Sequence, residues 1–288
     1  MQYRKVGDYT LSRFGLGTKR MPITDVSRVD RLDREAAREI ANEAIEQGMD
    51  FFDTSYSNHK GEAEDFLGEF TSERPELAQF VATSYFELVD PRYEYVFNKQ
   101  LKKLKTDKID FYSLEGVCDL TRMRDIDSGA VDFLFEQREK GAIGCLGFSS
   151  ELSPENLRDY IERYPWDYVR MTINYCDWFT KGGDERYAAV KEAGLPIIAH
   201  GAMRTGVRSS LKPEALSILK EADPNRTSAE WALSFVKSLD TVASTTCNMH
   251  SAREVKENAA VFGDDTVLTA DELEVLRACA KAQQCTQR

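Results

Sequence analysis

Eight short apolar segments, each followed by a longer segment with helical periodicity, recur along the chain at intervals of about 30 residues. The expected strands cover residues 14–17, 51–53, 80–83, 109–114, 143–148, 168–173, 195–199 and 241–244. The expected helices cover residues 34–47, 62–70, 93–104, 131–140, 154–163, 185–193, 228–239 and 252–261. Eight such units predict an α/β fold of the (β/α)8 TIM-barrel type. An open, doubly wound parallel sheet has the same alternation, so the periodicity alone leaves both architectures open.

Two further segments extend this pattern. Residues 6–12 predict an N-terminal β-hairpin that would close one end of a barrel, and residues 268–282 predict an extra C-terminal helix. Glycines that follow helical segments and precede apolar strands are expected to end those helices in the left-handed conformation; these are Gly48, Gly141 and Gly194. No linker or low-complexity tract interrupts the chain, so we expect one domain over residues 1–288.

The composition narrows the classes of partner. A hydrophobic fraction of 42% supports a sizeable core, and a net charge of -11 argues against nucleic acid or an anionic membrane surface as a partner. No apolar run approaches the roughly 20 residues of a membrane-spanning helix, and residues 1–5 do not begin a signal peptide. We therefore expect a small-molecule substrate and a cytoplasmic location. The sequence favours no oligomeric state.

The cysteines and histidines do not predict a metal site. The six cysteines are scattered and form no CxxC pair, which favours a reduced, cytoplasmic chain. The three histidines, His59, His200 and His250, have no i, i+4 spacing that would favour a metal site.

A carboxylate and a phenol follow the short apolar strand at residues 51–53. Asp53 stands at its end and Tyr56 comes three residues later. Because a phenol has a pKa of about 10, it needs fixed neighbours to transfer a proton near neutrality, and a carboxylate is one such neighbour. Taken alone, such a pair is more often a surface or turn feature than a site.

Several segments together resemble the aldo-keto reductases. The stretch around Asp53 and Tyr56 resembles the family's FDTAxxY signature, whose Asp and Tyr belong to a catalytic tetrad. Other matching segments are residues 15–18, 107–112, 144–149, 173–175, 229–233 and 254–258. The chain looks closest to a bacterial branch whose members often carry a C-terminal ferredoxin-like segment. Residues 284–288 resemble only the start of its cysteine cluster, so no iron–sulfur cluster is expected.

The resemblance implies hydride transfer from a nicotinamide to a carbonyl, with the tyrosine as proton donor and a lysine and a histidine as its helpers. In this chain Ser84 occupies the lysine position and Glu115 the histidine position. Both changes alter charge, so the reduction of ordinary aldehydes and ketones is expected to be weak. A glutamate at this position resembles the family's steroid double-bond reductases and points to an enone.

Glu115 would place a second carboxyl near Asp53, so one of the two is expected to titrate high. A protonated Glu115 would be a stronger proton donor than Tyr56. Lys19, which follows the first strand, is the candidate replacement for the missing cation.

The resemblance also implies a set of positions that contact the cofactor. These are Ser149 and Ser150 for the carboxamide, Thr172, His200 as a flat ring, Arg204 at the pyrophosphate, Asn248, Glu257 and Asn258. Asn248 and Glu254 stand where the family grips a 2′-phosphate with basic residues. We therefore expect NAD(H) or NADP(H) to bind, with no preference for NADPH.

The leading interpretation is a nicotinamide-dependent oxidoreductase that reduces a ketone or an enone, with the carbon–carbon double bond as a target. Two alternatives stay open: a redox-neutral acid–base enzyme that performs elimination or isomerisation, and a binding protein without catalysis. A group of aromatic residues after two strand ends is expected either to line an apolar substrate pocket or to cap the rim; these are Tyr85, Phe86, Tyr175, Trp178 and Phe179.

Overall fold

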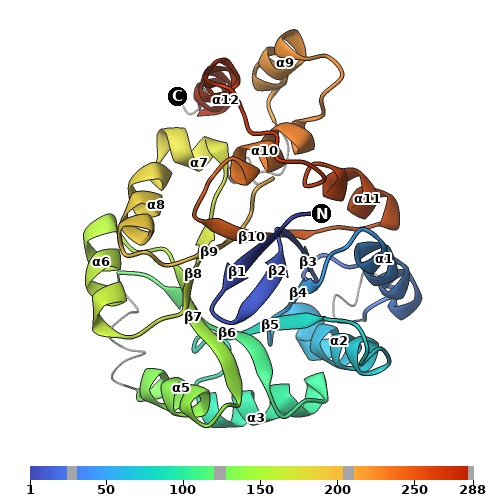
Figure 1. Cartoon of the computed structure of the whole chain (residues 1–288), viewed down its shortest axis with the longest axis vertical. Coiled ribbons are helices and arrows are strands. Elements are labelled where there is room, and N and C mark those ends of the chain that lie inside the picture. The colour runs from blue at the N-terminus through green and yellow to red at the C-terminus, as the bar shows by residue number, and fades with distance from the viewer. Residues whose placement is uncertain (25–30, 120–127, 204–210, 285–288) are drawn as a thin grey trace.

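A computed structural model describes residues 1–24, 31–119, 128–203 and 211–284 of the chain. Eight parallel strands close a barrel in the order β10-β3-β4-β5-β6-β7-β8-β9, which confirms the TIM-barrel prediction and excludes the open sheet (Figure 1). The barrel strands are β3 (Phe14–Gly17), β4 (Phe51–Asp53), β5 (Phe80–Tyr85), β6 (Ile109–Val117), β7 (Ile143–Ser150), β8 (Tyr168–Thr172), β9 (Ile197–His200) and β10 (Val242–Asn248).

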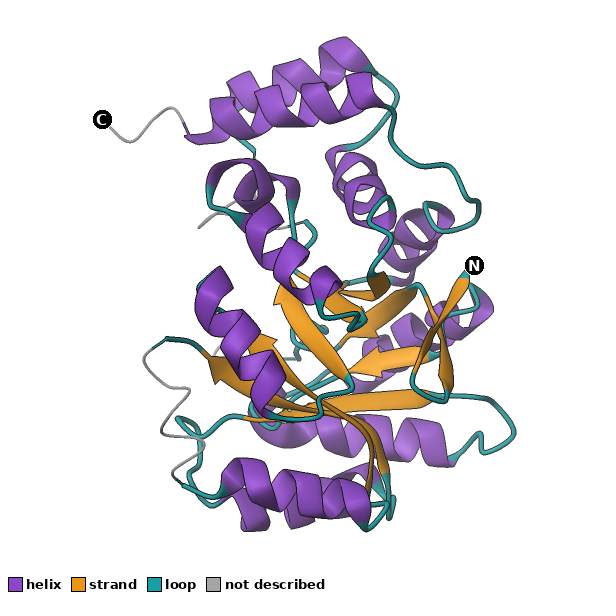
Figure 2. Ribbon diagram, turned by 60° about the vertical axis from the view of Figure 1, so that its left-hand side comes forward, coloured by secondary structure: helices purple, strands orange, loops and turns teal. Residues whose placement is uncertain are grey.

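Helices surround these strands on the outside (Figure 2). Among the described residues they are α1 (Arg34–Glu46), α2 (Glu62–Ser72), α3 (Tyr93–Leu104), α5 (Ala130–Glu139), α6 (Pro154–Arg163), α7 (Tyr175–Thr180), α8 (Gly183–Glu192), α9 (Pro213–Ala222), α10 (Ser228–Lys237), α11 (Ala252–Ala260) and α12 (Ala270–Gln284). A 3-10 turn, η1 (Asn58–Gly61), precedes α2. No helix in the described ranges is both long and apolar enough to span a bilayer.

The N-terminal hairpin closes one end of the barrel, as predicted. It consists of β1 (Tyr3–Val6) and β2 (Tyr9–Ser12), and it lies across the centre of the barrel in Figure 1. Val6 and Leu11 are fully buried in one apolar cluster with inward-facing barrel residues. That cluster also contains Phe51, Ala82, Phe111, Cys145, Tyr168, Ile198 and Ala243.

Polar residues occupy the next layer of the barrel. Side chains on one face of a strand recur every second residue, so the positions two residues after Phe51, Tyr168 and Ile198 face the same interior. Those positions carry Asp53, Arg170 and His200. This layer lies toward the carboxyl ends of the strands, where TIM barrels place their sites.

The glycine positions confirm the predicted helix ends. Gly48, Gly141 and Gly194 have φ values of 80°, 79° and 72°, a conformation that glycine adopts without steric cost. Thr269 and Glu272 form a capping box before α12: Thr269 N donates to the Glu272 carboxylate at 2.8 Å, and Glu272 N donates to Thr269 Oγ1 at 3.2 Å.

The sequence analysis missed two helices, α7 and α9. α7 is only six residues long, so it lacks the length that reveals periodicity. Its N-cap is Asn174, whose side chain accepts from Asp177 N. α9 packs against the C-terminal helix α12 (Figure 1).

Candidate functional site

A cavity of about 440 Å³ opens at the carboxyl ends of the barrel strands. Its walls come from the turn after β3, the loop after β4, the strands β6, β8 and β10, and the end of β9. The lining residues are Lys19, Arg20, Asp53, Thr54, Ser55, Ser57, Asn58, Glu115, Arg170, His200, Gly201, Ala202, Met203, Thr246, Cys247 and Asn248.

An ion pair between Asp53 and Arg170 forms the base of this cavity. Arg170 Nη2 donates to Asp53 Oδ2 at 2.6 Å, and Thr246 Oγ1 donates to the same oxygen at 3.2 Å. The two charged side chains are only 11% and 14% exposed. Arg170 Nε is buried and has no hydrogen-bond partner within the described part of the chain.

The electrostatics of this pair favour a charged Arg170. Burial by itself lowers the pKa of Arg170, but the carboxylates of Asp53 and Glu115 raise it, and the net direction is upward. Burial raises the pKa of Asp53; Arg170 opposes this rise and Glu115 adds to it. The net direction for the pKa of Asp53 is therefore upward, and burial is its main cause.

Glu115 is held by Ser84 on the neighbouring strand. Ser84 Oγ donates to Glu115 Oε2 at 2.7 Å, so the serine orients the carboxylate of Glu115 from the adjacent strand. Behind β5, Gln100 Nε2 donates to the carbonyl of Ser84 at 3.0 Å and to the buried carboxyl of Glu64 at 2.8 Å. This network fixes the end of β5 against α3.

Tyr56 lies outside the cavity. Lys99 Nζ on α3 donates to the Tyr56 hydroxyl at 3.4 Å and lies 5.3 Å from the centre of its ring. Its neighbour Asn58 lines the cavity instead, with Asn58 Nδ2 donating to Thr18 Oγ1 at 3.1 Å. In the FDTAxxY signature the tyrosine follows the Asp by five positions, and counting five from Asp53 reaches Asn58. The tyrosine position of the signature therefore carries Asn58, and the match to Tyr56 was out of register.

The loop after Asn58 is strained. His59 and Lys60 adopt φ values of 49° and 51°, which residues with a side chain rarely take, and such strain is concentrated at functional sites. His59 Nε2 lies 3.1 Å from the carbonyl of Thr18, so it joins this loop to the turn after β3.

The predicted cofactor residues divide into two groups. His200 and Asn248 line the cavity, and the Asn248 side-chain oxygen accepts from Lys19 N at 2.9 Å. Ser149, Ser150 and Thr172 are not among its lining residues. Ser150 Oγ accepts from Leu152 N at 3.2 Å, and Thr172 Oγ1 donates to Glu151 at 3.5 Å.

Two of the remaining predicted residues belong to α11. Asn258 is buried there, and Glu257 is exposed and bonded to Arg253 Nε at 2.6 Å. Glu254 accepts from His250 N at 2.8 Å, which places a carboxylate near the start of this helix. Arg204 lies outside the described residues.

The sequence analysis missed three residues that bear on this site: Arg170, Asn58 and Arg253. Arg170 had a signal, because a charged residue inside a buried parallel strand requires a partner. The structure makes Arg170, and not Lys19, the ion-pair partner of Asp53, although the charge of Lys19 also lowers the pKa of Asp53. Asn58 could have been found by counting along the signature.

The aromatic residues expected at a substrate pocket do not line the cavity. Tyr85 and Tyr175 are fully buried. Trp178 and Phe179 pack against Phe235 of α10. The cavity wall is correspondingly more polar than expected.

Burial also weakens the acidity of three thiols, including that of Cys247 in the cavity wall. Burial raises the pKa of Cys145, Cys176 and Cys247 to about 12, so these cysteines stay protonated and act as small apolar groups. No group of three or more metal-binding side chains occurs among the residues that the structure describes.

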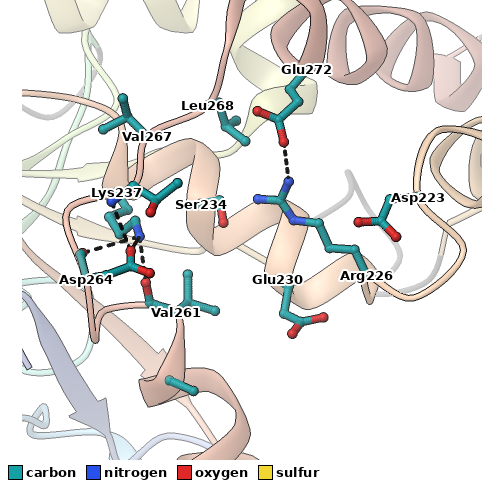
Figure 3. A pocket seen from close by; sticks show the side chains of 12 residues that line it. Asp223, Arg226, Glu230, Ser234, Lys237, Val261, Asp264, Val267, Leu268 and Glu272 are labelled. Carbon is teal, nitrogen blue, oxygen red and sulfur yellow. Dashed lines mark hydrogen bonds and ion pairs between the residues drawn. The ribbon is translucent and has the colours of Figure 1, made fainter.

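A second cavity, of about 370 Å³, lies between α10, the loop after α11 and the start of α12 (Figure 3). Its two cations are both paired: Lys237 Nζ donates to Asp264 at 2.9 Å and to the carbonyl of Val261 at 2.8 Å, and Arg226 pairs with Glu272 at 2.7 Å. These contacts account for the two cations as structural ties, in contrast to the barrel mouth.

Comparison with known proteins agrees with this geometry. An oxidoreductase of Bacillus subtilis (strain 168), YqkF, whose description calls it uncharacterised, is 22% identical over 98% of this chain and 97% of its own length. The holo form of the aldo-keto reductase AKR11C1 from Bacillus halodurans is 25% identical, with a TM-score of 0.78 over 100% of this chain and 99% of its own.

An aldo-keto reductase from Klebsiella pneumoniae, solved in complex with NADPH, is 18% identical and superimposes with a TM-score of 0.72, covering 96% of this chain and 93% of its own. The sequence model of the Aldo/keto reductase family matches residues 13–281. The chain therefore belongs to the aldo/keto reductase family.

Proposed function

We propose that this protein is a nicotinamide-dependent oxidoreductase that reduces a ketone or an enone of moderate size, with Glu115 as the proton donor. The observation that carries the proposal is the composition of the cavity: Glu115, Asp53 and Arg170 line it, whereas the Tyr56 hydroxyl lies against Lys99 outside it. A carboxyl is therefore the group available to move a proton toward a substrate oxygen or carbon. Family membership supports the redox class.

The residues present fit the nicotinamide end of such a cofactor. The cavity is large enough for a ring and a small substrate, His200 offers a flat face, and Arg170 Nε is a buried donor without a partner. A bound nicotinamide would supply the hydride. His200 and Asn248 are the cavity residues that would hold it, and Glu257 and Asn258 would contact the adenosine.

Residues of the cavity would stabilise the developing charge and donate the proton. Ser84 orients the Glu115 carboxyl through a 2.7 Å hydrogen bond, leaving the other carboxyl oxygen for a ligand. Arg170 places a fixed positive charge at the cavity base, which stabilises negative charge that develops on a reacting oxygen. Asp53 holds the guanidinium in that place.

A second candidate, redox-neutral acid–base catalysis, is favoured by one specific observation. Asn58, which neither donates nor accepts a transferable proton, stands at the signature's tyrosine position, and two carboxyls with an arginine remain. Two carboxyls whose environments differ suit the acid and the base of an elimination or isomerisation.

We expect both NADH and NADPH to bind, without a preference for NADPH. The reason is that Asn248 and Glu254 supply no positive charge to bind a 2′-phosphate. The nearby Arg253 is already paired with Glu257. Titration of the purified protein with each nucleotide, followed by tryptophan and tyrosine fluorescence, gives the two dissociation constants. NADPH binding more than about tenfold tighter than NADH, with a steep loss in salt, would contradict this expectation, because salt screens a phosphate contact. Binding of neither nucleotide would remove the redox proposal and leave the acid–base class.

A further inference from the structure

Two adjacent cations, Lys19 and Arg20, stand on a rigid turn at the edge of the barrel cavity. Thr18 before them is buried, its N–H donates to the carbonyl of Asp53 at 2.9 Å, and its hydroxyl donates to Thr54 Oγ1 at 2.9 Å. Met21 after them is buried, and Met21 N donates to the carbonyl of Thr18 at 3.2 Å. The backbone of this turn is therefore fixed from both sides.

A side chain from the adjacent strand β10 adds a third anchor. The Asn248 side-chain oxygen accepts from Lys19 N at 2.9 Å, which ties the turn to the end of β10. Because the backbone is already ordered, a ligand that contacts these residues need order only the two side chains. Preorganisation of this kind lowers the cost of binding.

The charges in the cavity leave these two cations available. Arg170 is already paired with Asp53, and Glu115 is bonded to Ser84. Neither Lys19 nor Arg20 forms an ion pair with any residue in the described ranges, although both line the cavity. Two adjacent cations at the mouth of a cavity, in a chain of net charge -11, attract an anion to this edge.

We propose that the substrate of this cavity carries a carboxylate, which Lys19 and Arg20 bind. This inference rests on the proposed function in that it uses the same cavity. Because Arg170 at the base is already paired with Asp53, the carboxylate lies at the turn, and the uncharged, reacting part of the substrate lies toward Glu115. The pyrophosphate of a nucleotide is the competing occupant of these two cations, and the experiment separates the two.

A matched pair of ketones tests the substrate as the occupant. 4-Acetylbenzoate and its methyl ester have the same ring and ketone and differ in one negative charge. Isothermal titration calorimetry of the wild-type protein with each compound, without any turnover, gives the contribution of that charge to the binding free energy. The variant Lys19→Gln/Arg20→Gln removes both cations, and Lys220→Gln, on the exposed side of α9, removes one cation away from the cavity as a control.

We expect the wild-type protein to bind the acid at least about tenfold more tightly than the ester, because hydrogen bonds between charged groups are the strong ones. The double variant should lose this ratio, and Lys220→Gln should keep it. Titration with ADP-ribose forms the second arm. An affinity for ADP-ribose that falls about tenfold in the double variant, with the acid and the ester bound alike, would assign the two cations to the nucleotide and overturn the proposal.

Equal affinities of the wild-type protein and the double variant for both probes would overturn the proposal. Failure of the wild-type protein to bind either probe at millimolar concentration would overturn it as well. Because every readout is equilibrium binding, these outcomes are independent of hydride transfer. An enzyme that prefers the acid to the ester but never oxidises a nicotinamide would refute the proposed function and leave this inference intact.

Discussion

Replacing Arg170 by methionine is expected to cost about 3–5 kcal/mol of unfolding free energy at pH 8, because removing one member of a buried ion pair leaves the other charge without a partner. In this barrel the remaining charge is Asp53, which would keep only the hydrogen bond from Thr246. Chemical denaturation followed by circular dichroism measures the loss.

The loss should depend on pH with a defined sign. Burial already raises the pKa of Asp53, and Arg170 is the group that most opposes this rise. Without the guanidinium the folded-state pKa rises further above its unfolded value. A carboxyl with a raised folded-state pKa favours folding least at high pH, so the variant's stability falls as the pH increases above the ordinary value near 4.

The double variant Arg170→Met/Asp53→Asn provides the control, because it removes the unpaired charge together with its partner. It should recover most of the stability and lose the added pH dependence. A variant Arg170→Met as stable as the wild type at pH 8 would show that the pair does not hold the base of the cavity.

Replacing Glu115 by glutamine is expected to lower turnover by about 10²–10⁴, the range that a positioned general acid contributes. Glutamine keeps the shape of the side chain and can still accept from Ser84 Oγ, but it carries no transferable proton. Nucleotide affinity should therefore stay within about twofold of the wild-type value, since this change removes the donor and not a binding contact. Turnover is measured on the best substrate from a panel of enones and ketones.

Tyr56→Phe is the matched comparison for that variant. Because the Tyr56 hydroxyl contacts Lys99 outside the cavity, its removal should leave turnover within about twofold of the wild-type rate, since a group that does not touch the substrate contributes no acid catalysis. A loss of activity confined to Tyr56→Phe, with Glu115→Gln fully active, would reverse the assignment of the proton donor.

The fold was predictable because its signals are local. Short apolar strands, helical periodicity and glycine helix ends each depend on a few neighbouring residues, and together they predicted eight alternating strands and helices. The resemblance to the family was needed to favour a closed barrel over an open sheet. The short helix α7 escaped because six residues make less than two turns.

The site was only partly predictable because its contacts join distant segments. Asp53 and Arg170 are 117 positions apart, and the alternation of side chains along two strands brings them together in the barrel. Applying the alternation of inward and outward positions to every strand would have placed Arg170 in the same layer as Asp53. Lys19, which follows the first barrel strand, was the only residue considered as a replacement for the family's lysine, and no position on β8 was considered for that role.

Tyr56 shows a different reason for error. A phenol near an aspartate looked chemically sufficient, whereas the loop geometry distinguishes positions two residues apart. Tyr56 turns toward α3 and Asn58 turns toward the cavity. The spacing in the signature carried this information, and the residue type alone did not.

The most direct test of the proposed redox function is the fate of an isotope. Purified protein is incubated with the substrate panel and NADH that carries deuterium at the transferable C4 position, and the products are analysed by mass spectrometry and NMR. The oxidoreductase account predicts one deuterium on carbon in the product, in step with the loss of NADH absorbance. Conversion of a substrate to product without deuterium on carbon and without consumption of NADH would contradict it and would assign the cavity to redox-neutral acid–base chemistry.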